Sequence, residues 1–143
     1  MKRINNIVLF MLLAAFIAGC QSTIAFVHEE LNLNELEGNI LEWAQSLDDV
    51  EGVHLARVSV SRKSEEYYIF INNPDIYAME MGHAQDINSL AIETNPTGIY
   101  LPNDTKVSPF LNKVYRITTT NRRAEQVVLN GEVIQVSDIE NIK

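Results

Sequence analysis

Apolar residues recur at helical spacing between residues 33 and 47. They form one stripe along a helix, made of Leu33, Leu36, Ile40, Trp43, Ala44 and Leu47. Asn34 with Glu37 three residues later resembles a capping box, and Gly52 lies where the pattern ends. The pattern predicts one amphipathic helix whose stripe packs on a sheet, with a partner-binding role for the stripe as the alternative.

Two strand patterns follow the helix, separated by a polar link at 63–65. Residues 53–62 alternate between apolar and polar, whereas residues 67–71 are apolar on both faces. A strand of the second kind is typical of a central position in a sheet or of cover on its second side. The short link favours an antiparallel hairpin, and the Asn-Asn-Pro-Asp run at 72–75 ends the second strand.

The middle of the chain has a weaker pattern. Residues 76–84 show no clean period, and Asp86 is placed to cap a short helical turn that reaches Ala91. The Asn-Pro-Thr-Gly run at 95–98 predicts a type I turn, and residues 114–120 have the β-branched character of a strand.

An Asn-Gly pair at 130–131 lies between two apolar runs, 125–129 and 132–136. This is a strong signal for a two-residue hairpin, because a type I′ turn requires positive φ at both central residues. The register pairs residue 129 with 132 and residue 127 with 134. It places four side chains on the face expected to meet the core: Val127, Leu129, Ile134 and Val136.

Together these elements predict an α+β domain with one N-terminal helix packed on an antiparallel sheet of five to seven strands. A small β-barrel with a leading helix is the alternative. The 143 residues, 46% of them hydrophobic, suffice for one domain and are too few for two well-packed ones. The chain contains no internal repeat and no low-complexity segment.

The N-terminus carries a different kind of signal. Lys2 and Arg3 precede an apolar run at 7–18, which has the length of a signal-peptide core and is shorter than the about 20 residues that span a bilayer. Residues 17–20, Ile-Ala-Gly-Cys, resemble the lipobox of bacterial lipoproteins, in which an aliphatic residue and two small residues precede the lipidated cysteine.

This resemblance implies cleavage before Cys20, a diacylglycerol thioether on its sulfur and an acyl chain such as palmitate on its new amino group. Several acyl chains give stable membrane anchoring. The resemblance also implies an extracytoplasmic location. Gln21, in place of the aspartate that marks inner-membrane retention, favours the Gram-negative outer membrane facing the periplasm, with the outer face of a Gram-positive plasma membrane as the alternative.

Cleavage defines three regions: a signal peptide at 1–19, a lipidated tether at 20–32 and a domain at 33–143. It removes two cations and leaves 124 residues with 9 basic and 19 acidic side chains, a formal charge of −10 once the amino group of Cys20 is acylated. The acidic balance argues against nucleic-acid binding and predicts that anionic headgroups repel the domain. The tether contains apolar Ile24, Phe26 and Val27, so part of it could instead pack or pair as an edge strand.

Candidate metal ligands are sparse. The one cysteine excludes an intrachain disulfide, and the histidines are His28, His54 and His83. Glu80, His83 and Asp86 have the spacing i, i+3, i+6, which on a helix would share a face and offer nitrogen and oxygen ligands. A plain surface loop is the other interpretation of this segment, and we expect no metal site and no cofactor.

Catalytic signatures are equally sparse. The chain has no Gly-x-Ser-x-Gly elbow and no glycine-rich phosphate loop. Three adjacent acid pairs, at 29–30, 48–49 and 65–66, are expected to be solvated surface charges. One enzyme hypothesis stays open: a small hydrolase or metal-binding enzyme with a loop site near His83 and Asp104.

Two further clusters allow binding. Arg122 and Arg123, with Arg116 nearby, form a basic cluster that could dock an acidic partner or a lipid phosphate, or be a plain polar turn. Tyr67 and Tyr68 should face opposite sides of one strand, so that at least one is core and the other is free to be a ligand or interface aromatic.

The sequence therefore predicts a lipid-anchored, non-enzymatic protein-interaction or accessory module of the cell envelope. Besides the hydrolase, the alternative is a small-ligand carrier with a pocket between helix and sheet, lined by Trp43, Tyr68 and Phe70.

Overall fold

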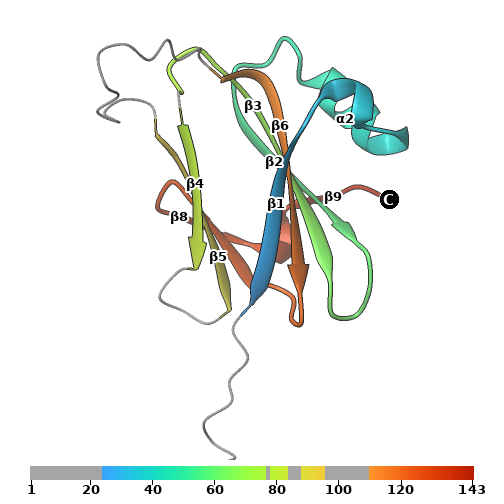
Figure 1. The fold of residues 1–143 in the computed structure, drawn as a ribbon, viewed down its shortest axis with the longest axis vertical. Coiled ribbons are helices and arrows are strands. Elements are labelled where there is room, and N and C mark those ends of the chain that lie inside the picture. The colour runs from blue at the N-terminus through green and yellow to red at the C-terminus, as the bar shows by residue number, and fades with distance from the viewer. Residues whose placement is uncertain (1–23, 77, 84–87, 96–109) are drawn as a thin grey trace, which may run out of the picture.

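Two β-sheets face one another, and an α-helix covers the outer face of the larger one (Figure 1). The computed structural model describes residues 24–76, 78–83, 88–95 and 110–143. The five-stranded sheet contains, in spatial order, β1 (Ala25–Leu31), β6 (Phe110–Thr120), β3 (Glu65–Asn73), β2 (Gly52–Ser59) and β9 (Glu140–Asn141). The four-stranded sheet contains β4 (Ala78–His83), β5 (Ser89–Asn95), β7 (Gln126–Leu129) and β8 (Glu132–Gln135). The helix is α2 (Gly38–Ser46), and two 3-10 turns are η1 (Leu33–Glu35) and η2 (Val136–Asp138).

Strand β3 is buried on both faces, as its sequence predicts. Tyr67, Ile69 and Ile71 point into the core between the two sheets, whereas Tyr68 and Phe70 point to the helix side. All five side chains are at most 6% exposed. Alternation along a strand sends successive residues to opposite faces, so a run that is apolar at every position can only be satisfied by cover on both.

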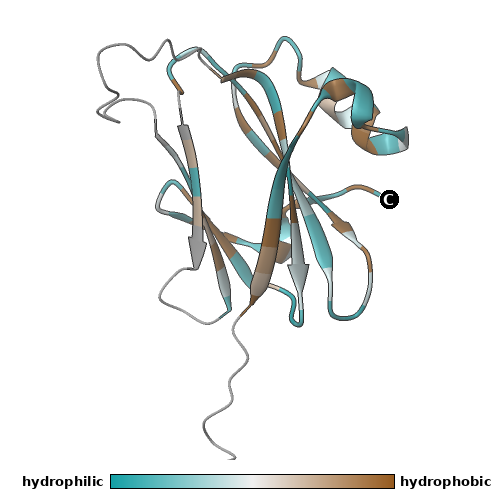
Figure 2. Ribbon diagram, viewed as in Figure 1, coloured by the Kyte–Doolittle hydropathy of each residue, from teal (hydrophilic) through white to brown (hydrophobic). Residues whose placement is uncertain are grey.

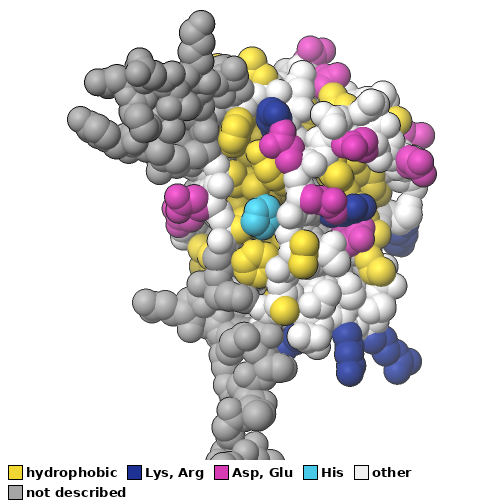
Figure 3. All heavy atoms as spheres, in the orientation of Figure 1, with side chains coloured by type: hydrophobic (Ala, Val, Ile, Leu, Met, Phe, Trp, Pro, Cys, Tyr) yellow, Lys and Arg dark blue, Asp and Glu magenta, His cyan; other side chains and the backbone are white. Residues whose placement is uncertain are grey.

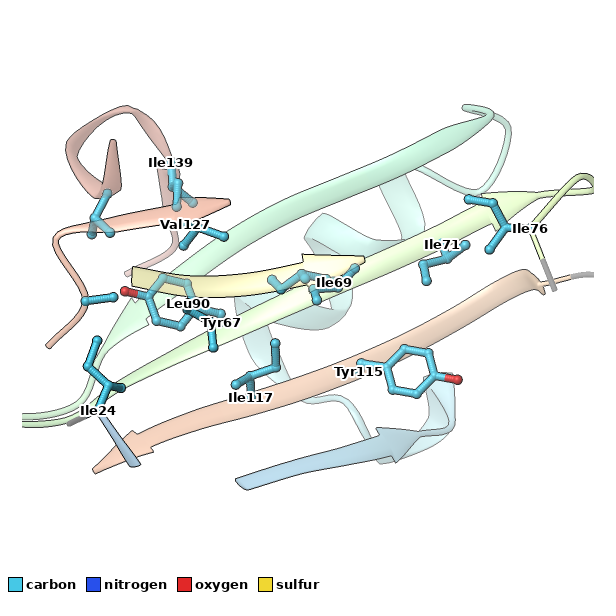
Figure 4. Packing of buried hydrophobic residues seen from close by; sticks show 13 residues of the cluster. Ile24, Tyr67, Ile69, Ile71, Ile76, Leu90, Tyr115, Ile117, Val127 and Ile139 are labelled. Carbon is cyan, nitrogen blue, oxygen red and sulfur yellow. The ribbon is translucent and has the colours of Figure 1, made fainter. Parts of the chain in front are cut away.

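The core between the sheets joins side chains from strands far apart in the chain. Ile69 and Ile117 of the larger sheet pack with Leu90, Ile92 and Val127 of the smaller one (Figure 4). All five are fully buried. This contact holds the two sheets face to face.

The second core lies between α2 and the larger sheet. Trp43 meets Phe70 edge to face, with ring centroids 6.5 Å apart, and Ala44 is fully buried beside them. Hydrophobic and hydrophilic residues alternate around α2, with the apolar stripe directed at the sheet (Figure 2).

The helix is shorter than the predicted span of 33–47. Gly38 has φ of +56°, in the left-handed region, so the chain cannot run as one continuous helix from η1 into α2. The expected capping box between Asn34 and Glu37 is therefore wrong. The structure instead places the carboxylate of Glu35 2.6 Å from the backbone N–H of Asn32, which donates to it.

The predicted α+β class, mostly strands with one helix, is confirmed for the described residues, but the strands divide between two sheets and not all of them are antiparallel. Strands β5 and β7 pair in parallel, as do β2 and β9. A parallel pair needs a long connection, and β6, which crosses to the opposite sheet, supplies it between β5 and β7.

The middle of the chain also differs from its prediction. The patternless segment from residue 78 forms β4, and Leu90 and Ala91 lie in β5 and not in a helical turn. Pairing between these two strands overrides the weak local preference. The turn expected at 95–98 extends beyond the described residues.

The C-terminal hairpin is confirmed in its register. Leu129 pairs with Glu132 and Val127 with Ile134, and Asn130 and Gly131 have φ of 51° and 81°. The turn also closes the end of β5, because the backbone N–H of Thr94 donates to the side-chain oxygen of Asn130 at 2.7 Å.

The segment expected as a tether is mostly folded. Strand β1 pairs with β6 along its whole length, and Ile24 is 1% exposed in the core between the sheets. The folded body thus includes residues 24–31 as well as those from residue 33 onward, in agreement with the edge-strand alternative. Pairing with β6 satisfies backbone groups that an apolar tether would leave in water.

A buried carboxylate ties together the end of the sheet where β1 begins. Glu65, 1% exposed, accepts a hydrogen bond from the Tyr67 hydroxyl at 2.7 Å and one from the Arg57 guanidinium at 3.3 Å. Arg123 lies 3.7 Å from the same carboxylate. A buried charge is tolerated only when it is paired in this way, so β2, β3 and the chain after β6 are held in one arrangement.

Shortening single side chains of β3 tests the arrangement of two sheets and a helix in three layers. We expect Phe70→Ala to cost about 3–5 kcal/mol and Ile69→Ala about 2–5 kcal/mol of unfolding free energy, because each leaves a cavity in a different core. Val133→Ala is the control, since this side chain is 55% exposed and should change stability by no more than about 0.5 kcal/mol. Urea denaturation measures all three, and a loss below about 1 kcal/mol for either core variant would contradict burial on both faces.

Alkaline pH should unfold the protein. Burial and the neighbouring Glu30 carboxylate raise the pKa of Tyr115 to about 12, and burial beside Glu65 raises the pKa of Tyr67 as well. These hydroxyls titrate near 10 in the unfolded chain, so their contribution is complete below pH 10 and is lost as the pH rises through the folded-state value. Urea midpoints should fall between pH 10 and 12, and Tyr115→Phe should flatten that fall. A midpoint constant over this range would overturn the expectation.

Candidate functional site

The candidate metal residues do not form the expected helical set. Residues 78–83 form strand β4, and a three-residue spacing does not repeat on one face of a strand. Glu80 is exposed, whereas the side chain of His83 and all of Asp86 and Asp104 lie outside what the structure describes. Among the described residues no group of three His, Cys, Asp or Glu side chains could hold a metal ion.

The adjacent acid pairs do not converge either. Glu29 and Glu30 form ion pairs with Arg116 and Lys113 on the neighbouring strand, and the pairing with Lys113 lowers the pKa of Glu30. The carboxylate of Glu65 is buried, whereas that of Glu66 accepts from Tyr68 at 2.9 Å. Residues 48–49 are exposed in the turn after α2. The expectation of solvated surface charges is therefore wrong for Glu65, which is buried and paired, whereas residues 48–49 are exposed as expected.

The residues expected to line a ligand pocket are packed together. Trp43, Tyr68 and Phe70 belong to the buried cluster between α2 and the sheet. Tyr67 and Tyr68 do face opposite sides, and both are core residues. The aromatic side chains therefore fill the space in which the carrier hypothesis expects a ligand.

Cys20 lies outside the described residues. Within the described part of the chain, no helix is long and apolar enough to cross a membrane.

An open groove of about 320 Å³ follows the outer edge of β2. We call it the β2 groove; it is lined by Trp43, Leu47, Val53, His54, Leu55, Leu129, Ile134, Asp138, Ile139 and Glu140. Its volume is at the lower end of the range of about 300–1,000 Å³ for ligand pockets. The groove differs from a closed pocket because a sheet edge forms its floor.

The floor of the β2 groove offers backbone hydrogen-bonding groups. Strand β9 pairs only with Ala56 and Arg57, and the Arg57 carbonyl accepts from the N–H of Ile142 at 3.0 Å. Backbone groups alternate in direction along a strand, so those of Val53 point to the same outer edge as those of Arg57. In the described part of the chain they have no strand partner.

Two apolar walls rise on either side of this edge. Trp43 and Leu47 form the wall on the helix side, and Leu129, Ile134 and Ile139 form the wall on the side of the smaller sheet. The ring of His54 lies on the helix side, 6.3 Å from the Phe70 ring, with Nε2 3.2 Å from the Val50 carbonyl. The walls belong to the two different cores, and the β2 edge separates them.

The surroundings of the β2 groove are acidic. Asp138 and Glu140 are exposed lining residues, and no lysine or arginine is among the lining residues. Asp48, Asp49 and Glu51, all exposed, follow α2 and lead into β2. The groove therefore suits a positively charged or neutral occupant.

The opposite edge of the same sheet is built differently. Strand β1 carries Glu29 and Glu30, which pair with Arg116 and Lys113 and keep charge along that edge. Charged side chains are a usual protection of an exposed sheet edge against further pairing. The β2 edge lies between apolar walls, and its charges, Asp138 and Glu140, are all of one sign, which makes it the better candidate for strand addition.

Spacing along the chain does not reveal this site. Its walls and floor come from three segments, 43–55, 129–134 and 138–140, which are brought together by the larger sheet and by η2. His54 was an isolated histidine in the sequence, and Asp138 and Glu140 had no assigned role. The alternation of Asp138, Ile139 and Glu140 is a signal that the sequence does contain at this site.

The structure separates the three arginines that the sequence suggested as one basic cluster. Arg116 lies on β6 and pairs with Glu29, away from Arg122 and Arg123, which follow the end of that strand. Of the other histidines, His28 is exposed on β1.

Comparison with protein-family models, curated proteins and solved structures finds no match to this chain.

Proposed function

We propose that this chain is the precursor of a lipid-anchored, extracytoplasmic bacterial lipoprotein that binds an extended segment of another envelope protein in the β2 groove. The lipobox-like residues 17–20 support the anchor. The edge of β2 at Val53, which has no strand partner among the described residues and lies between two apolar walls, is the observation that supports the binding role. The protein acts by holding its partner and not by catalysis.

Strand addition explains how such a groove would bind. An extended peptide adds to the sheet through main-chain hydrogen bonds, while its alternate side chains fill pockets on either side. At Val53 the peptide would continue the line that β9 begins at Ala56. Apolar side chains would contact Trp43 and Ile134, and basic ones would face Asp138 and Glu140.

The anchor sets where this binding takes place. Cleavage before Cys20 and acylation of that residue attach the body to a membrane leaflet that faces away from the cytoplasm. Gln21 favours the outer membrane of a Gram-negative cell, with the body in the periplasm, and the outer face of a Gram-positive plasma membrane is the alternative. The partner is accordingly an envelope protein within reach of that surface.

A peptide titration tests the groove. The probe is a six-residue peptide in which valine alternates with lysine, and the readout is the fluorescence of Trp43, the one tryptophan in the chain. We expect saturable binding and at least about a tenfold loss of affinity for the same peptide N-methylated at alternate residues, because N-methylation removes main-chain donors. Equal binding of both peptides would rule out strand addition.

The acids of the groove provide a matched comparison. Asp138→Asn and Glu140→Gln should each weaken binding of this peptide about two- to fivefold and reduce its salt dependence. Glu93→Gln, an exposed acid on β5, is the control and should change neither.

Replacing the lipidated residue tests the anchor. Cys20→Ala should leave the precursor without acyl chains, so that the mature protein is lost from the membrane fraction. Mass spectrometry of that fraction from cells with the unchanged chain should give an N-terminal acylated Cys20. An intact, unmodified Met1 in the membrane-bound protein would refute the lipoprotein assignment.

A further inference from the structure

One end of the molecule is basic, although the chain as a whole is acidic. Four of the eight lysine and arginine residues that the structure describes lie in two loops, Arg62 and Lys63 between β2 and β3, and Arg122 and Arg123 after β6. We call these four residues the basic end. Dark blue side chains gather at this lower edge of the molecule in Figure 3.

The basic end lies where the N-terminal segment enters the fold. Ala25 of β1 pairs with Thr120 of β6, and Thr119 pairs with Glu65, the first residue of β3. The start of β1 and both basic loops therefore share one end of the larger sheet (Figure 1).

The two loops form one surface. The Arg123 guanidinium donates to the Ser61 carbonyl, with Nε at 3.0 Å, and also faces the buried carboxylate of Glu65. Arg62 and Lys63 are exposed and have no ion pair among the described residues, and Arg122 lies 3.5 Å from the exposed Glu125. Exposed Val60, an apolar residue, adjoins them. By contrast, Lys113 and Arg116 are paired with Glu30 and Glu29 on β1.

The distance to the anchor is short. Cys20 precedes the buried Ile24 by four residues, so their Cα atoms are at most about 14 Å apart even in a fully extended chain. The Debye length at physiological ionic strength is about 8 Å. So short a link allows the basic end to come within one Debye length of the lipid headgroups, whereas charges farther from the surface than this length are screened from it.

We infer that the basic end docks on the anionic phospholipid headgroups of the membrane that holds the lipid on Cys20. This inference rests on the proposed lipid anchor, and it reverses the repulsion expected from the overall charge of −10. Cations near an anionic membrane surface each strengthen attachment, by roughly fivefold. The uneven distribution of charge, and not its sum, decides how the body meets the membrane.

Docking in this way gives the β2 groove a defined direction. Strand β2 runs from Gly52 at the far end to Ser59 at the basic end, and His54 in the groove is five residues from Ser59. At about 3.3 Å per residue the groove lies about 17 Å beyond the basic end along the strand. The groove then lies well above the membrane surface, within reach of a partner in the aqueous compartment.

Two labelled variants of the lipidated protein test this inference. Because Cys20 is blocked by lipid, an introduced cysteine is the one free thiol. Val60→Cys at the basic end and Val50→Cys beyond the other end of β2 replace exposed valines, and each carries a polarity-sensitive fluorophore. Both proteins are reconstituted on vesicles of phosphatidylcholine alone and on vesicles that also contain phosphatidylglycerol.

The label at residue 60 should shift to shorter wavelength on the anionic vesicles only, and the shift should disappear in high salt. The label at residue 50 should not respond. Arg62→Gln with Lys63→Gln should abolish the shift, whereas Lys143→Glu, the same change of two charge units elsewhere, should preserve it. Equal spectra of the residue 60 label on both vesicles, or an equal response at residue 50, would overturn the docking.

Failure of the anchor would look different. A protein without acyl chains would not float with phosphatidylcholine vesicles at all, which would refute the proposed lipoprotein. Flotation on those vesicles without a response of the residue 60 label on anionic ones would refute the docked orientation alone. Inorganic phosphate at millimolar concentration should not reproduce the spectral shift; a shift caused by phosphate alone would assign the basic end to a free anion.

Discussion

Burial of β3 on both faces is the constraint on which the rest of the structure depends. Tyr67, Ile69 and Ile71 need a second sheet opposite them, and Tyr68 and Phe70 need the helix. One strand therefore determines a three-layer molecule, in which β2 and β6 flank β3 in the larger sheet. The walls of the β2 groove extend from these two cores, one from each.

The two proposed surfaces lie toward opposite ends of β2. At one end the buried carboxylate of Glu65 draws Arg57 and Arg123 together, and this pairing holds the two basic loops side by side. Toward the other end β9 begins to pair only at Ala56, so that among the described residues the edge at Val53 has no strand partner and lies between apolar walls. A body attached by the first end would present the second to a partner. The direction of β2 would then determine both how the body is oriented on the membrane and where its partner binds.

Local sequence signals succeeded where the local physics is strong. The apolar run at 67–71 predicted a strand covered on both sides, and the Asn-Gly pair predicted the hairpin register, because positive φ at Asn130 and Gly131 is a local requirement. Local signals failed where pairing with a neighbouring strand determines the secondary structure. Strand β4 has no clean period, and Ala91 lies in a strand because the neighbouring strands supply its hydrogen bonds. The predicted helix also began too early, at residue 33, because the positive φ of Gly38 separates the 3-10 turn η1 from α2.

The sequence by itself determined that the chain is a mixed α and β domain, that its central strand is covered on both sides, and that its N-terminus resembles a lipoprotein precursor. These properties depend on short stretches whose composition and spacing have direct physical consequences. Only the tertiary structure decided that β1 is part of the body and that Arg62 and Lys63 lie beside Arg122 and Arg123. It also decided that, in the part of the chain that the structure describes, β9 covers the edge of β2 at Ala56 and Arg57 alone. Each of these depends on which remote segments pair in the larger sheet, and the energy of that pairing resides in contacts that no local pattern records.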